Sequence, residues 1–230
     1  MMQEDYPVSG QVHSFMYSVY AWMACALLVS ALTAYYVAVT PAIFKWIYGN
    51  IFVLIMLFVA QIGLVIGLSL LLPRLTLVTA LIMFLLYAGL LGVSLSVIFH
   101  IYTTASIFST FITAAGMFGV MAVYGYVTRT DLTTVGNISV MILFGLIIGL
   151  VVNLFLRSTT MDLVLSGVGV VIFSLLTAYD TQKIKELGQR MLAEQETMQK
   201  VAVLGALTLY LDFINLFLFL LRFMGRRREN

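Results

Sequence analysis

The sequence predicts an all-α integral membrane protein with seven transmembrane helices. Of its 230 residues, 62% are hydrophobic and 10% are charged, whereas soluble domains carry about 25% charged residues. Seven apolar runs, each roughly 17–25 residues long, have the length that a helix needs to cross a bilayer. The alternation over about ten residues that marks a membrane β-strand is absent. A water-soluble protein is therefore excluded, because one core cannot bury this much apolar surface.

The predicted spans follow one another through a single domain, residues 1–230. A short N-terminal tail, residues 1–18, precedes them, and a basic C-terminal tail, residues 224–230, follows them. The predicted spans are residues 19–39, 51–72, 75–99, 103–127, 138–156, 163–179 and 201–223. An odd number of spans places the two ends of the chain on opposite sides of the membrane.

The connections between the first six spans are short. Pro73 and Arg74 separate the second and third spans and predict a tight hairpin. Residues 100–104 alone divide the third span from the fourth, and Arg129 and Asp131 mark the connection that follows. We therefore expect few structured elements outside the membrane on this part of the chain.

The one long polar segment, residues 181–200, lies between the sixth and seventh spans. Within it Ile184, Leu187 and Met191 fall on one face of a helix, and charged residues take the other faces. We therefore expect the sixth helix to continue into this segment and the chain to turn back near Glu196.

The charges exclude some functions and leave the orientation undecided. The 12 Lys and Arg residues divide evenly between the two sides of the membrane, so the positive-inside rule does not choose one. No basic patch of the size that nucleic acid requires is present. No nucleophile–base set or metal motif occurs either, so we expect neither an enzyme nor a tightly bound cofactor.

Two acidic residues carry the candidate chemistry. Asp212 lies about halfway along the last span, where a carboxylate costs a few kcal/mol and is usually functional. Asp180 ends the sixth apolar run, and an ordinary interfacial residue is the open alternative for it. If the two helices form an antiparallel hairpin that turns near Glu196, the two carboxyl groups lie at similar depth.

Two facing carboxylates about 4 Å apart repel by roughly 4 kcal/mol at an effective dielectric of 20. Such a pair retains one proton and titrates as a coupled unit. The shared proton ties the two helices together, and its loss leaves two carboxylates that repel or hold a hard cation such as calcium. The hypothesis is therefore that Asp180 and Asp212 form a pH sensor, a gate and a calcium site.

Two further polar residues lie inside predicted helices. Asn215 is one turn beyond Asp212 on the same face, and it is either an auxiliary ligand or a hydrogen bond between helices. Gln61 lies in the second span and either lines a cavity or bonds a neighbouring helix. Both are candidates for auxiliary polar residues of the site.

Two stretches connect the chain with a known family. LTAYDTQKIK, followed near the C-terminus by GALTLYLDFINLFLFLLRF, resembles the Bax inhibitor-1 family, also called transmembrane Bax inhibitor motif proteins. The stretch YTTASIFSTFITAAGMFGVMAVYGY is similar to bacterial members. The resemblance covers most of the chain and implies six helices around a central C-terminal helix.

The resemblance also implies an activity, a pH-sensitive calcium leak through the membrane, with calcium as the permeant or transiently bound ion. The proton-sharing aspartates of that family match Asp180 and Asp212. A cytoplasmic N-terminus in a bacterial inner membrane is implied, with the aspartate pair toward the cytoplasm. A bacterial relative uses an arginine near the end of helix two as a latch. Arg74 is the nearest residue here, and the alternative is a boundary charge that extends to the interface.

The function expected is thus a calcium leak channel whose partners are the bilayer, calcium and protons. The alternative is a membrane-embedded regulator that binds and modulates other membrane proteins, such as a quality-control protease. Some bacterial relatives behave in that way, yet the N-terminal tail here offers no obvious binding segment.

Overall fold

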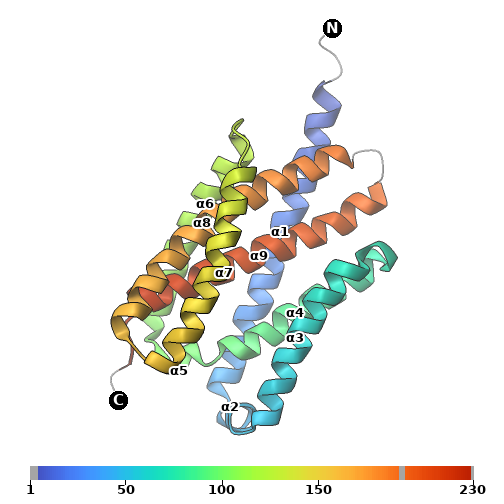
Figure 1. The fold of residues 1–230 in the computed structure, drawn as a ribbon. Coiled ribbons are helices and arrows are strands. Elements are labelled where there is room, and N and C mark those ends of the chain that lie inside the picture. Colours follow the sequence, from blue (N-terminus) through green and yellow to red (C-terminus); the bar gives the residue numbers. More distant parts are fainter. Residues whose placement is uncertain (1–4, 192–194, 229–230) are drawn as a thin grey trace. The chain divides into compact units, whose positions relative to one another are not determined.

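The computed structural model describes residues 5–191 and 195–228, and nearly all of them are helical (Figure 1). Seven helices are long and apolar enough to cross a membrane. No strand occurs within the described ranges, where the extended contact is a single antiparallel bridge between Tyr102 and Arg227. The predicted class, an all-α protein with seven membrane-spanning helices, is confirmed.

The order of elements follows the predicted spans closely. The elements are α1 (Asp5–Val39), α2 (Pro41–Tyr48), α3 (Ile51–Leu71), the 3-10 turn η1 (Leu72–Arg74), α4 (Leu77–Leu95), α5 (Ile98–Ile101), α6 (Thr104–Val127), α7 (Thr133–Leu156), α8 (Thr159–Arg190) and α9 (Gln195–Met224). The hairpin predicted at Pro73 is η1, and the Thr76 hydroxyl caps the next helix by accepting the Thr79 N–H at 3.2 Å.

The first helix differs from its prediction. It begins at Asp5, so the expected tail at residues 1–18 is wrong from that residue onward. Val12, Phe15 and Val19 are buried at helical spacing, and this apolar stripe continues the helix beyond the strongly hydrophobic run. The short helix α2 was not predicted; it starts with Pro41, whose fixed φ suits the first turn of a helix.

The sixth predicted span continues as expected. Helix α8 runs through to Arg190, well past the end of its apolar run. The connection to α9 lies between Arg190 and Gln195. The turn was predicted near Glu196, a few residues further along the chain, and Glu196 itself belongs to α9. The long polar segment is thus mostly helix on both sides of a short connection.

The chain divides into two compact units. The first unit comprises Met1–Ile101 and Leu187–Tyr210, and the second comprises Tyr102–Glu186 and Leu211–Asn230. Helices α8 and α9 each contribute to both units. The expectation of a single domain stays a prediction.

Close approach between helices is set by glycine in each unit. In the first unit, a Cβ at Gly92 of α4 would lie 2.5 Å from the carbonyl oxygen of Ser30 on α1. In the second unit, Gly125 of α6 lies directly against the carbonyl group of Ala178 on α8. Only a residue without a side chain lets these backbones meet.

Helix α9 is the most buried of the seven spans. Of its most apolar stretch 72% is buried, against 11–50% in the other six. Within the first unit it contacts α1 and α4 through Tyr210, and within the second unit it contacts α6 through Phe213 and α8 through Phe219. These contacts partly support the expected arrangement with a central C-terminal helix.

Candidate functional site

Asp212 is buried inside α9. Its side chain is 5% exposed, and its Oδ2 atom has no N–H or O–H partner among the described residues. Asp180, on α8, is partly buried. Both residues belong to the second unit, so the structure defines how they lie relative to each other.

The two aspartates are brought together. The side chains of Asp180 and Asp212 lie close enough to interact with each other. Two carboxylates have only acceptor oxygens, so a hydrogen bond between them requires a proton on one of the two groups. Two carboxyl groups this close favour a state in which one of them keeps its proton.

The packing of α8 against α9 explains this meeting. Two residues that precede Asp180 on α8 contact α9. The ring of Phe173 stacks on that of Phe219 at a centroid distance of 5.6 Å, and Gly167 lies against Phe223. Residues earlier in α8 therefore contact residues later in α9, as in an antiparallel pair of helices. Asp212, Phe219 and Phe223 are spaced by seven and four residues, which places them on one face of α9.

Lysines extend the site along α8. Lys183 interacts electrostatically with Asp180 and lies 5.4 Å from the centre of the Tyr179 ring. Lys185 donates through Nζ to the carbonyl oxygen of Tyr126 on α6 at 2.7 Å. A positive charge thus lies close to the partly exposed member of the pair.

Gln182 holds this part of α8 in place, and the sequence interpretation missed it. Its Oε1 accepts the Leu132 N–H at 2.8 Å, and its Nε2 donates to the Thr130 carbonyl at 2.8 Å. Its side chain is 6% exposed. The α6–α7 connection is therefore bonded to the residue two positions after Asp180. Only its place beside Asp180 in the stretch LTAYDTQ hinted at this role.

The side-chain amide groups of the two auxiliary candidates are hydrogen-bonded to other groups. Asn215 donates through Nδ2 to the Leu211 carbonyl of its own helix at 2.8 Å. Gln61 belongs to the first unit, where its Nε2 donates to Leu90 O at 3.0 Å and Ser94 Oγ at 2.7 Å on α4. Of the two readings given for Gln61, the interhelical bond is the one the structure contains.

Arg74 is exposed at the end of η1 and belongs to the first unit. Asp180 belongs to the second unit, so the latch between them stays a prediction.

The pair offers few ligands for a metal ion. No group of three or more His, Cys, Asp or Glu side chains that could hold a metal occurs within the described residues. Calcium takes six to eight oxygen ligands in a tight site. Two carboxyl groups supply at most four of these oxygens.

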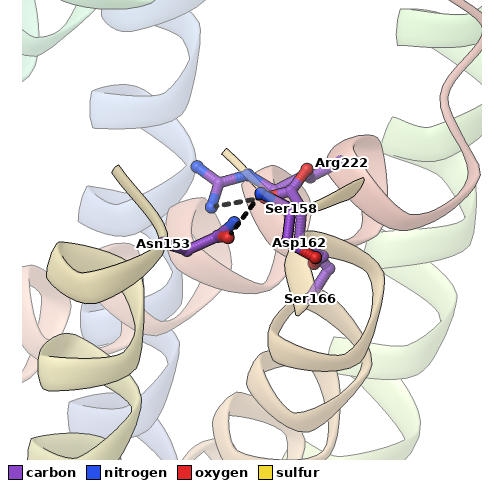
Figure 2. Close-up of polar contacts among 5 residues, drawn as sticks. All are labelled: Asn153, Ser158, Asp162, Ser166 and Arg222. Atoms are coloured by element: carbon purple, nitrogen blue, oxygen red, sulfur yellow. Dashed lines mark hydrogen bonds and ion pairs between the residues drawn. The ribbon is translucent and has the colours of Figure 1, made fainter. Parts of the chain in front are cut away.

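A second polar contact joins α8 and α9 near the beginning of α8. Figure 2 shows Asp162 of α8 facing Arg222 of α9, with Asn153 and Ser158 beside them. The Arg222 Nη1 and Asp162 Oδ1 atoms are 3.7 Å apart, and the side chains are 39% and 29% exposed. An ion pair this exposed contributes about 0–1 kcal/mol, so it supports the alignment of the two helices more than their stability.

Comparison with known proteins places the site in a family context. The family model described as "Inhibitor of apoptosis-promoting Bax1" matches residues 12–229. Inner membrane protein YbhL of Escherichia coli K12 is 44% identical over 218 residues, which cover 94% of this chain and 93% of the relative. An uncharacterized protein of Borreliella burgdorferi is also 44% identical, over 95% of this chain and 94% of its own length. The match to the family model includes both aspartates and runs through all seven spans.

Proposed function

This chain belongs to the Bax inhibitor family of membrane proteins, and on that premise we propose that it is a passive, pH-gated calcium leak channel. The observation that supports the proposal is that α8 packs against α9 and brings two acidic side chains from different membrane-spanning helices together. A buried acid in a span is expensive and is usually functional.

The closed state is the one with the shared proton. That proton bridges Asp180 and Asp212 and ties α8 to α9. When it leaves, two carboxylates about 4 Å apart repel by roughly 4 kcal/mol at an effective dielectric of 20. The repulsion favours separation of the helices, and the two negative charges attract a divalent cation as cargo. The leak therefore increases as the pH rises through the titration of the pair.

The surroundings of the pair fit an ion route better than a storage site. Besides Asp212 Oδ2, the hydroxyl groups of Thr181 on α8 and Thr110 on α6 are buried in the second unit without a partner among the described residues. Uncommitted oxygen atoms lower the cost of removing water from a passing cation. The proposed location is a bacterial inner membrane, which the name of the E. coli relative supports. The cytoplasmic N-terminus is a further part of the proposal and follows from the family resemblance.

Calcium flux into proteoliposomes across pH 5–8 tests the proposal. We expect the wild-type flux to rise with pH. Asp180→Asn and Asp212→Asn each replace one carboxyl with an amide whose N–H donates at every pH. Both variants should therefore show a low flux that no longer depends on pH.

Asp131→Asn is the matched control, because it removes a carboxyl that lies in the α6–α7 connection and bonds the backbone of Thr133. It should keep the wild-type pH profile. An unchanged pH profile in both pair variants would remove the sensor role.

A further inference from the structure

The basic segment that follows α9 is folded against the beginning of α6 in the second unit. It passes Tyr102 so closely that a Cβ at Gly225 would lie 2.9 Å from the tyrosine ring. The Arg226 N–H donates to the Ser106 hydroxyl at 2.9 Å, and the Arg226 carbonyl accepts the Thr103 N–H at 3.1 Å. The segment is therefore held by its own backbone, and its side chains are not needed to fix it.

The arginine side chains of this segment are exposed and uncommitted. Arg226, Arg227 and Arg228 are all exposed, and their guanidinium groups have no ion pair or hydrogen bond among the described residues. Four residues before Arg226, on α9 itself, Arg222 faces Asp162 of α8 in the exposed ion pair of Figure 2. The described residues around the end of α9 therefore hold four exposed arginines and one acid.

Arg157 adds a fifth basic group, at a backbone position that disfavours it. It follows α7 with a φ of 51°, and among the described residues it is the one residue other than glycine with a positive φ. Its N–H donates to the Asn153 carbonyl at 2.7 Å, and the Asn153 side chain accepts the Ser158 N–H at 3.0 Å. Glycine would suit this left-handed turn better. Such strain points to a use for the arginine side chain.

Exposed aromatic rings lie beside these arginines along the chain. Phe155 is 80% exposed and lies two residues before Arg157, and Phe223 is 49% exposed and follows Arg222 directly. Both rings belong to helices that are long and apolar enough to cross a membrane, so they suit contact with lipid. A guanidinium group next to them lies where the hydrocarbon of a bilayer meets its headgroups.

We propose that the arginines at this end of the second unit form a binding site for the phosphate group of an anionic phospholipid. A guanidinium group binds phosphate oxygens through paired N–H donors. An excess of arginine over acid favours a lipid with net negative charge over a zwitterionic one. The site is called the arginine cluster below and consists of Arg157, Arg222, Arg226, Arg227 and Arg228.

The aromatic rings decide between a lipid and a soluble phosphate compound. A lipid acyl chain can contact Phe155 and Phe223, whereas a soluble phosphate compound leaves both rings without an apolar partner. Because all five arginines belong to the second unit, the structure defines the arrangement of the cluster. The inference concerns a part of the chain that the proposed leak does not use, and it stands or falls independently of calcium transport.

Lipid binding to the purified full-length protein tests the site. The protein in a neutral detergent is titrated with phosphatidylglycerol or phosphatidylcholine, and bound lipid is counted by native mass spectrometry. We expect phosphatidylglycerol to bind about tenfold more tightly, with a preference that weakens as salt is added. Glycerol phosphate has the anionic group without acyl chains and should not displace the lipid. Displacement at equal concentration would indicate a site for soluble phosphate compounds and overturn the proposal.

Arg227→Gln and Arg129→Gln remove the same charge at opposite ends of α6, and both side chains are exposed. Arg227→Gln should weaken phosphatidylglycerol binding about fivefold, and Arg129→Gln should leave it unchanged. The triple variant Arg226→Gln, Arg227→Gln, Arg228→Gln should bind the two lipids alike. Equal losses in the two single variants would overturn the proposal, because the attraction would then belong to any arginine at a membrane boundary.

Two further variants separate a fixed site from a charged tail. Ser106→Ala keeps every charge and removes the hydroxyl that accepts the Arg226 N–H, so phosphatidylglycerol binding should weaken about threefold. Arg157→Gly removes one charge and relieves the left-handed backbone. It should bind the lipid less tightly and unfold at the same or a higher temperature without lipid, which a merely structural role of Arg157 does not predict.

Thermal unfolding in the neutral detergent shows that each variant is folded before its lipid binding is compared. Unchanged phosphatidylglycerol binding in both Ser106→Ala and Arg157→Gly would overturn the fixed site. A wild-type protein that binds phosphatidylglycerol and phosphatidylcholine with equal affinity would overturn the preference for anionic lipid. Neither result bears on the pH dependence of calcium flux, so the two proposals are tested separately.

Discussion

Polar side chains inside the spans of this protein differ in whether their hydrogen-bonding groups are already used. The side-chain amide groups of Gln61 and Asn215 donate hydrogen bonds to backbone carbonyl groups. Asp212 keeps an oxygen without such a partner and meets Asp180. Bonded amides hold helices together, whereas a pair of acids changes its interaction when a proton leaves. At the scale of residues, this difference separates the candidate gate from ordinary packing.

Gln182 carries a prediction at this scale. Replacing it with alanine leaves the buried Leu132 N–H and the Thr130 carbonyl without their side-chain partners, which should cost about 1–3 kcal/mol of unfolding free energy. Gln182→Glu keeps the acceptor for Leu132 and loses only the donor to Thr130, so its loss should be smaller. Thermal or denaturant unfolding in detergent micelles measures both. Equal stability of the wild type, Gln182→Ala and Gln182→Glu would contradict a stabilising role for these two hydrogen bonds.

At the scale of helices, glycine decides which faces meet. The GxxxG spacing of the sequence indicates close packing at Gly63, Gly67, Gly145 and Gly149. A Cβ would meet a neighbouring side chain at Gly67 and Gly149 but nothing within 4 Å at Gly63 and Gly145. The closest backbone approaches occur at Gly92 and Gly125, outside these motifs. Spacing along one helix does not say which partner helix is present.

Helix α6 offers a matched pair of glycine substitutions. In Gly125→Ala the new methyl group meets the Ala178 carbonyl of α8, two residues before Asp180. Since backbone cannot move aside cheaply, we expect a loss of about 1–3 kcal/mol. Gly119→Ala has open space around it and should be neutral or stabilising by up to about 1 kcal/mol through helix propensity. Unfolding midpoints in detergent compare them, and equal effects would contradict the assigned contact.

At the scale of the whole molecule, the two longest C-terminal helices belong to both compact units. Helix α9 contributes Tyr210, which is hydrogen-bonded to Ser30, to the first unit, and Asp212, which lies beside Asp180, to the second. Each unit therefore has its own polar contact on this helix.

The orientation of the molecule is tested by cysteine labelling in a Cys25→Ser background. With a cytoplasmic N-terminus and seven spans, Arg228→Cys should react with an impermeant maleimide in intact spheroplasts. Arg129→Cys, in the α6–α7 connection, should react only after the membrane is opened. Both positions are exposed in the structure. The reverse pattern would place the aspartate pair toward the outer side and contradict the proposed orientation.

Much of the architecture could be predicted because a bilayer imposes its thickness on every span. The seven helices, the hairpin at Pro73 and the extension of α8 all follow from apolar length and helical spacing. The meeting of Asp180 and Asp212 could be expected from hairpin symmetry and from the family resemblance. Helix α2 and the early start of α1 were missed because their apolar signal is short or diluted by polar residues.

The sequence was sufficient for properties that depend on position along one helix: the spans, the places of the two acids along them and the class of protein. Contacts between helices required the folded structure. The hydrogen bond from Tyr210 to Ser30 joins residues 180 positions apart. The hydrogen bond between Gln182 and Leu132 joins α8 to the α6–α7 connection. Apolar lipid gives helices no hydrophobic reason to choose one partner face over another. The choice depends on glycine gaps and on single hydrogen bonds, whose partners become neighbours only when the chain has folded.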